Sequence, residues 1–205
     1  MNSDSLTLRN RIAREAASLL YFGNENEFKQ AKQKAAETFK CKFLPTNLEV
    51  AIELDKIAEE NEGPERKQHL IKMRKEALKT MNLVKAYNPI LIGSVWRGTI
   101  HRESDIDIRV YHDDPKEVLK TLERSDYKIL RRELVTVTER GQKKTSFHVY
   151  LESNEKERIE IIVRSSEELN CKEKCETYGD EITGLTMKQL ERILEENPAK
   201  RFLPV

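Results

Sequence analysis

The chain has few cysteines and no long apolar run, and each scarcity excludes a class of protein. Its 205 residues include three cysteines, an odd number that argues against a disulfide framework. Cys171 and Cys175 lie four residues apart, but no second pair completes a zinc site. No apolar stretch reaches about 18 residues, and no secretory signal is present. We therefore expect reduced thiols and a cytoplasmic protein that does not span a membrane.

The charge is high but balanced. Charged residues make up 36% of the chain and the net charge is +1, so no overall field draws the protein onto nucleic acid. Between Pro64 and Lys85, however, seven basic residues stand against two acids. This basic helix could contact the phosphates of an RNA acceptor, although a solvated lysine-rich face is the commoner role.

The first 88 residues show helical periodicity. Thr46 and Glu49 have the spacing of a capping box, and Gly63-Pro64 breaks the helix that the box begins. Apolar residues recur every three or four positions on both sides of that break. We expect four helices, at about 5–22, 28–39, 46–62 and 64–87.

Residues 89–165 show strand patterns instead, at about 90–92, 105–111, 128–138, 144–152 and 158–164. The last of these is almost continuously aliphatic, so we expect it to be central and covered on both faces. One helix should begin at Pro115, and two more should follow the strands, at about 165–176 and after Thr186. The predicted fold is α+β, a small mixed sheet with flanking helices (89–205) after a helical N-terminal segment (1–88). The sequence leaves open whether 1–88 is a separate domain.

One stretch combines two features that suit phosphates and cations. The apolar run Ile90–Ile92 leads into Gly93-Ser94, where glycine lets the backbone approach a ligand and the following amides can bind an anion. After a ten-residue spacer come Asp105 and Asp107, which a strand places on one face. Because adjacent carboxylates repel each other, such a pair indicates a cation site, and oxygen ligands suit Mg²⁺ or Mn²⁺.

This pattern resembles the signature of the DNA polymerase beta-like nucleotidyltransferase superfamily, an apolar-Gly-Ser turn followed by Asp-apolar-Asp-apolar. The string from Gly93 to Thr99 also resembles the loop of class I CCA-adding enzymes and related poly(A) polymerases. The resemblance implies two divalent ions and a nucleoside triphosphate substrate. It does not identify the acceptor, because the superfamily modifies RNA ends, small molecules and proteins. The alternative is an ordinary turn before a strand with solvated acids.

The resemblance further implies a third carboxylate on a later strand. Glu160 is the candidate metal ligand and catalytic residue beside Asp105 and Asp107, because an unpaired acid within an aliphatic strand would be costly. A salt bridge to Arg109 or Arg164 is the structural alternative for this acid. Glu152, on the polar side of the preceding strand, is the second choice.

Gly93, Ser94 and Arg97 are the candidate nucleotide-binding residues. The Ser94 hydroxyl and the amides after Gly93 would hold the phosphates. Arg97 lies on the same loop and can reach a phosphate, although a solvated loop charge is an equally good interpretation. His148 could line the triphosphate or acceptor side, but a structural histidine is the commoner role.

We therefore predict a metal-dependent nucleotidyltransferase that transfers a nucleoside monophosphate from a nucleoside triphosphate, with ATP as the first candidate, to an acceptor hydroxyl, with RNA as one candidate acceptor. A non-catalytic RNA- or protein-binding module on the same fold is one alternative, disfavoured because Asp105 and Asp107 are intact. An antitoxin-type nucleotidyltransferase that modifies a protein is another. The sequence does not indicate an oligomeric state.

Overall fold

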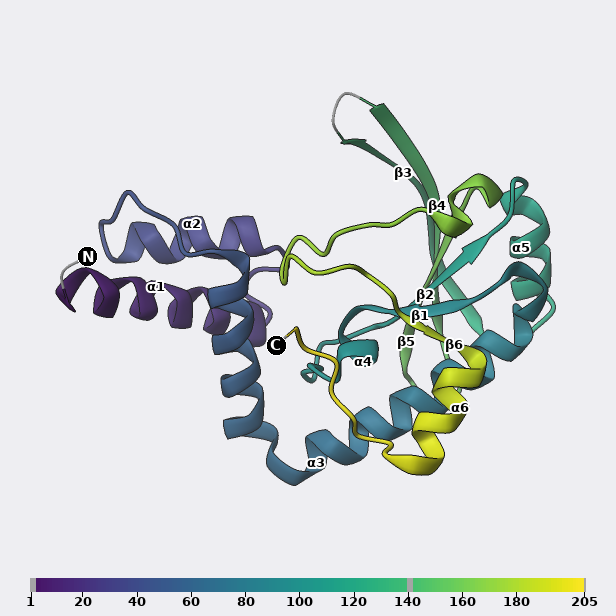
Figure 1. The fold of residues 1–205 in the computed structure, drawn as a ribbon, viewed down its shortest axis with the longest axis horizontal. Coiled ribbons are helices and arrows are strands. Elements are labelled where there is room, and N and C mark those ends of the chain that lie inside the picture. Colours follow the sequence, from purple (N-terminus) through teal and green to yellow (C-terminus); the bar gives the residue numbers. More distant parts are fainter. Residues whose placement is uncertain (1–2, 140–141, 205) are drawn as a thin grey trace.

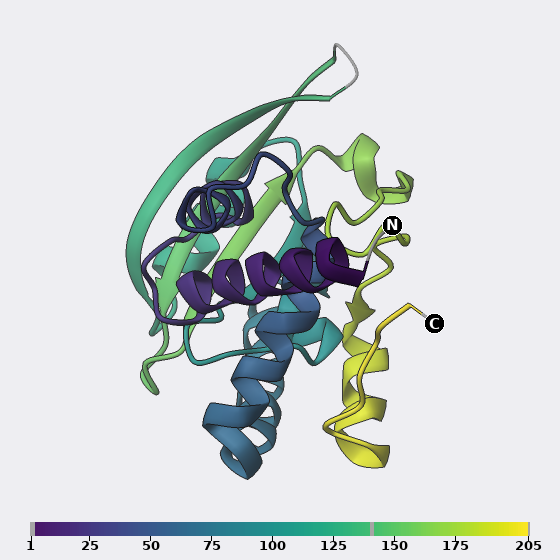
Figure 2. The ribbon, with the colours of Figure 1, turned by 90° about the vertical axis from the view of Figure 1, so that its left-hand side faces the viewer.

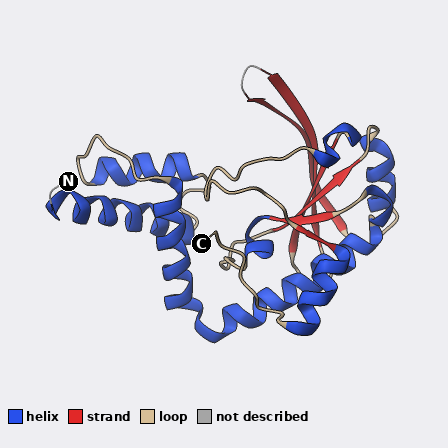
Figure 3. Ribbon diagram, viewed as in Figure 1, coloured by secondary structure: helices blue, strands red, loops and turns tan. Residues whose placement is uncertain are grey.

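A mixed six-stranded sheet is the central element of the computed structural model, which describes residues 3–139 and 142–204 (Figures 1 and 3). The strand order is β3-β4-β5-β2-β1-β6, and β2 pairs with β5 in parallel while the other pairs are antiparallel. The predicted α+β fold is confirmed. The strands are β1 (Ile90–Ile92), β2 (Ile106–Tyr111), β3 (Lys128–Glu139), β4 (Gln142–Glu152), β5 (Arg158–Arg164) and β6 (Leu185–Thr186).

The N-terminal helices α1 (Ser3–Tyr21) and α2 (Phe28–Thr38) lie side by side, away from the sheet (Figure 1). Together with the first part of α3 (Asn47–Leu83) they enclose an apolar cluster of their own, which is rich in alanine. Figure 2, seen from the side of these helices, shows the β3–β4 ribbon curving beyond them. The small side chains let the three helices approach closely, and the cluster is separate from the core beneath the sheet.

The helix α3 bends sharply at Gly63, whose φ of 51° and ψ of −135° are not helical, and Pro64 follows. The predicted break at this position is confirmed, as is the capping box, in which the Thr46 side chain accepts from the Glu49 amide and Glu49 accepts from the Thr46 amide. Beyond the bend, α3 packs against the sheet and contributes Leu70, Met73, Ala77 and Met81 to its core, followed by Val84 at the C-cap. The first part of α3 therefore packs on α1 and α2, and the part after the bend packs on the sheet. The predicted division of the chain into two domains at residue 88 stays a prediction.

The predicted basic surface of this helix is wrong in part. Arg66 and Arg74 are 5% and 0% exposed and turn inward. Arg66 donates to the Ile100 carbonyl at 2.7 Å. Arg74 donates to four backbone carbonyl oxygens, those of Val95, Trp96, Pro198 and Lys200, at 2.7–3.1 Å. These buried acceptors need donors, so two of the seven basic residues serve the fold and are unavailable to a polyanion.

The strand β5 lies between β4 and β2, so its predicted central position is confirmed. Its residues alternate, however: Ile159, Ile161 and Val163 are buried, whereas Glu160 and Ile162 are half-buried. The prediction that both faces are covered is therefore wrong. One face packs on the core, and the other faces the site described below.

Three further helices flank the sheet: α4 (Gly93–Arg97), α5 (Pro115–Glu123) and α6 (Met187–Glu196). As predicted, Asp114 caps α5 and Thr186 caps α6. The short segments Lys85–Tyr87 and Ser166–Asn170 are 3₁₀ helices.

The predicted helix at 165–176 is confirmed only in its first part, where Ser165 caps the 3₁₀ helix Ser166–Asn170. The rest of the prediction is wrong, because the backbone turns to an extended conformation at Cys171. An isolated β-bridge between Lys174 and Glu181 and an ion pair between Glu173 and Arg109, at 2.8 Å, accompany the extended course. None of the helices in residues 3–139 and 142–204 has the length and apolar character needed to cross a membrane.

Candidate active site

The register of the sheet brings the predicted acids together. Asp107 on β2 lies directly beside Glu160 on the parallel strand β5, so their side chains share a face. Asp105 stands just before β2. On the other side, Asp107 pairs with Ile92, the last residue of β1, and Gly93 follows at once as the first residue of α4. Three segments distant in sequence thus meet at one end of β2.

Gly93 and Asp107 approach each other so closely that only glycine fits. The backbone of Gly93 has a φ of 70°, which is costly for residues with a side chain. A Cβ atom at this position would overlap Asp107 Oδ2 and lie 2.9 Å from Asp107 Cγ. The conformation of Gly93 therefore places the backbone at the start of α4 directly against a carboxylate of the site.

Asp107 and Glu160 share a hydrogen bond between their carboxyl groups. Burial, followed by the charges of Glu160 and Asp105, raises the pKa of Asp107 well above its ordinary value, although part of Asp107 stays accessible from the cavity. Burial also raises the pKa of Glu160, but hydrogen bonds from His148 and Tyr150 outweigh it and hold that pKa below its ordinary value. Of the two acids, Asp107 therefore has the stronger tendency to bind a proton.

Glu160 is held by histidine, not by arginine. The His148 ring lies with Nδ1 2.6 Å from Glu160 Oε1 and Nε2 2.7 Å from the Ser146 hydroxyl. The two arginines considered as partners, Arg109 and Arg164, instead contact Glu173 at 2.8 and 3.3 Å. The orientation of Glu160 therefore depends on β4.

Asp105 has one arginine neighbour and an unsatisfied oxygen. Arg158 Nε lies 2.7 Å from Asp105 Oδ1, but the approach is not aligned for a hydrogen bond, and this buried oxygen has no hydrogen-bond donor. Burial raises the pKa of Asp105, and the positive charge of Arg158 partly opposes the shift. The Arg158 guanidinium thus neutralises Asp105 in part, and a bound cation would take over that role.

These oxygens fit a hard divalent cation by their chemistry. Carboxylate oxygens on a rigid sheet suit Mg²⁺ or Mn²⁺. Within residues 3–139 and 142–204, no three acidic, histidine or cysteine side chains are already gathered around one point as ligands. Cation binding would therefore require Asp107 to release its proton and Asp105 to turn from Arg158.

Two cavities meet at Asp105. The first, of about 360 Å³, is lined by Gly93, Ser94, Asp105 and Asp107 on one side, and by residues of α2, α3 and the 175–178 segment on the other. The second, of about 600 Å³, is lined by residues of the α1–α2 connection together with Arg131 and Arg158. The cavities share Phe28, Leu54, His101 and Asp105. The carboxylate of Asp105 can therefore be reached from two sides.

Arg97 also lines the first cavity, but its guanidinium already has partners. Its two terminal nitrogens lie 3.1 and 2.6 Å from the carboxylate oxygens of Asp180, and one of them donates to the Phe202 carbonyl at 3.1 Å. The rings of Trp96 and Tyr178 each lie 4.4 Å from its guanidinium carbon. Arg97 thus joins α4 to the 171–184 segment and the C-terminal stretch, and its phosphate-binding role stays a prediction.

Sequence reasoning missed three residues that support this site: Tyr150, Arg158 and Arg74. Tyr150 lies on the same polar face of β4 as His148, and this two-residue period was a usable signal. Arg158 and Arg74 had none, because the groups that they contact are remote in sequence. Glu152, the second choice for the third carboxylate, pairs with Lys156 at 2.9 Å and lines neither cavity.

Comparison with solved structures gives weak likenesses. A structure of the GLD-2/RNP-8 complex is 13% identical, with a TM-score of 0.33, over 52% of this chain and 43% of the other. A structure of a cytoplasmic RNA terminal U-transferase is 16% identical, with a TM-score of 0.30, over 57% and 34%. The chain thus spans less than half the length of either protein. No curated protein matches.

The family comparison is more extensive. A model of the nucleotidyltransferase domain family matches residues 71–181, from the second half of α3 to the segment before β6. The matched region is more than half of the 205 residues and contains the Gly93-Ser94 turn, the three acids and the β4 residues that hold Glu160. The chain therefore belongs to the nucleotidyltransferase domain family.

Proposed function

We propose that the protein transfers a nucleoside monophosphate from a nucleoside triphosphate to an acceptor hydroxyl, in a reaction that depends on divalent cations. One observation carries this proposal. The register places Asp107 beside Glu160 and against the backbone of Gly93, in the wall of a cavity that Ser94 also lines. The proposed cation ligands and the proposed phosphate-binding turn are therefore adjacent, as nucleotidyl transfer requires.

Asp105, Asp107 and Glu160 would hold two Mg²⁺ or Mn²⁺ ions, which when bound neutralise charge on the reacting phosphate oxygens. Because its pKa is raised, Asp107 would have to be deprotonated to serve as a cation ligand. His148 keeps Glu160 oriented through the 2.6 Å contact. Ser94 and the backbone at Gly93 would bind the triphosphate. A hydrogen bond from the Ser94 hydroxyl to a charged phosphate oxygen would contribute roughly 1.5–3 kcal/mol to binding.

We propose that the second cavity receives the acceptor. It is lined by Asp105 but not by Ser94, and the side chains of Arg131 and Arg158 at its wall are 60% and 46% exposed. Arginine is suited to phosphate groups because its planar guanidinium matches their oxygens. We therefore propose an RNA end as the acceptor and ATP as the donor. The reduced thiols predicted from the sequence favour the cytoplasm as the place of action.

The test is incubation with each α-labelled nucleoside triphosphate, Mg²⁺ or Mn²⁺, and a mixture of RNA, proteins and small alcohols. We expect label on RNA, loss of label with Glu160→Gln, and retention with Glu152→Gln, an acid on the neighbouring strand that lines neither cavity. Label on protein would favour the antitoxin-type alternative. Triphosphate binding without any labelled product would favour the non-catalytic module.

A further inference from the structure

The first cavity has a wall that the proposed transfer of phosphate does not use. Opposite the acids and Ser94 it is lined by Phe28 at the start of α2 and by Ala51 and Leu54 on α3. These residues belong to the N-terminal helices and not to the sheet. Apolar side chains cannot stabilise a triphosphate, because its charged oxygens need hydrogen-bond donors and cations.

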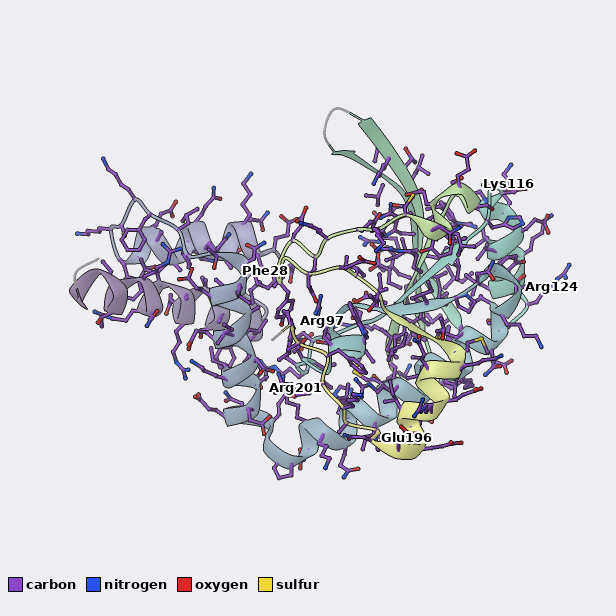
Figure 4. The ribbon with its side chains drawn as sticks, in the orientation of Figure 1. Phe28, Arg97, Lys116, Arg124, Glu196 and Arg201 are labelled. Atoms are coloured by element: carbon purple, nitrogen blue, oxygen red, sulfur yellow. The ribbon has the colours of Figure 1, made fainter. Side chains whose placement is uncertain are left out.

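This wall is fixed by the packing of the N-terminal helices. Phe28 and Leu54 are half-buried and pack against the apolar cluster of α1, α2 and α3, so each has one side in that cluster and also lines the cavity. Ala51 is buried and small, which leaves room between them. Figure 4 labels Phe28 between the N-terminal helices and the region of Arg97.

The remaining wall comes from the segment between β5 and β6. Cys175, Thr177 and Tyr178 line the cavity there. The Tyr178 ring lies 4.4 Å from the Arg97 guanidinium carbon, and Asp180 binds the same guanidinium. Two contacts thus fix the position of Tyr178 relative to α4, on which the phosphate-binding turn begins.

The charged groups of this part of the cavity already have partners. Asp55 accepts from Arg66 and Arg201, and Arg97 donates to Asp180. Besides the uncharged Cys175 and Thr177, this part of the cavity offers a ligand aromatic and aliphatic surface from Phe28, Leu54 and Tyr178. Such surface suits the flat face of a nucleobase. Every base can stack on an aromatic side chain, whichever hydrogen-bond donors and acceptors its edge carries.

We propose that the nucleoside part of the triphosphate lies between α2–α3 and the 175–178 segment, with its base against Phe28 and Tyr178. The inference rests on the proposed function and extends it. The N-terminal helices are then part of the substrate site, and they supply affinity for the base while the sheet and α4 supply affinity for the phosphates.

The test compares two probes in excess Mg²⁺, ATP and inorganic tripolyphosphate, which carries the phosphates without a nucleoside. Binding is measured by calorimetry on the full chain. Phe28→Ala should weaken ATP by about five- to a hundredfold, the loss expected for one base-stacking contact, and leave tripolyphosphate unchanged. Phe22→Ala is the matched control, since Phe22 is 51% exposed and lines neither cavity.

Tyr178→Leu provides an independent variant on another element, in case Phe28→Ala disturbs the helical cluster. It should show the same selective loss of ATP affinity. Equal losses for ATP and tripolyphosphate, or no loss for ATP in either variant, would overturn the proposed base site. If the wild type binds neither probe, the proposed function itself fails, and if it binds both with equal affinity, only the base site fails.

Discussion

Replacing Gly93 by alanine tests the contact on which the geometry of the site depends. The new side chain meets two penalties. A left-handed φ costs a residue with a Cβ about 1–2 kcal/mol. The overlap of that Cβ with Asp107 Oδ2 adds the cost of overpacking, about 1–3 kcal/mol. We therefore expect Gly93→Ala to lower the free energy of unfolding by roughly 2–5 kcal/mol.

Gly23 provides a control with matched backbone geometry. Its φ is also 70°, but a Cβ at this position meets no atom within 4 Å. Gly23→Ala should therefore cost only the first penalty, about 1–2 kcal/mol. Urea denaturation of both variants, with EDTA present, gives the difference that isolates the overlap with Asp107.

A double-mutant cycle with Asp107→Ala then identifies the partner. Removal of the carboxylate leaves room for the methyl group, so Gly93→Ala should cost about 1–3 kcal/mol less in that background than in the wild type. Equal destabilisation by Gly93→Ala and Gly23→Ala, together with additive energies in the cycle, would refute the close approach of Gly93 to Asp107.

Three other variants test the remaining contacts. Because the folded state raises the pKa of Asp107, its contribution to stability is complete below the unfolded pKa of about 3.9 and is lost as the pH rises through the folded pKa. Urea titrations without metal should therefore show Asp107→Asn gaining stability over the wild type as the pH increases, and a constant difference would contradict this. His148→Ala should raise the pKa of Glu160 and shift the acidic limb of the pH–rate profile upward, whereas His148→Gln, which retains a donor, should shift it less. Arg74→Met should cost at least about 3 kcal/mol in chemical denaturation, because it leaves several buried carbonyls without a donor, and a loss below 1 kcal/mol would argue against those bonds.

Local signals predicted the elements well. The capping box at Thr46, the break at Gly63 and the caps at Asp114 and Thr186 all depend on residues within a few positions of each other, and each is present. The strands around Asp107 were predicted for the same reason, since a two-residue period is a local property. The helix expected after Ser165 ends at Asn170 instead of Glu176. Beyond Asn170 the extended chain makes an ion pair with Arg109, which is remote in sequence, and a β-bridge with Glu181.

The buried arginines show why charge counts mislead. Arg66 and Arg74 look like part of a solvated basic face, but their acceptors lie near Ile100, at the end of α4 and in the C-terminal stretch. A local sequence pattern cannot reveal a hydrogen bond between residues that are more than a hundred positions apart, such as Arg74 and Lys200. The same holds for Asp105 and Arg158, which only the sheet brings together.

The role of the N-terminal helices could not be predicted from the sequence. In the sequence Phe28 is only the first residue of the helix expected at 28–39. Its contribution to the first cavity depends on how α2 and the bent α3 lie relative to α4. The sequence identifies the three carboxylates but not the directions in which their pKa values shift, because those depend on burial and on the His148 contact.

Binding of Mn²⁺, followed by electron paramagnetic resonance, tests most directly whether Asp105, Asp107 and Glu160 form a cation site. The wild type should bind Mn²⁺ more tightly at pH 8 than at pH 5, because a proton must leave Asp107, and Asp107→Asn should abolish binding. Asp113→Asn is the control, since that exposed carboxylate accepts from Ser165 and Ser166 outside the site. Equal Mn²⁺ binding by the wild type and Asp107→Asn would contradict the account.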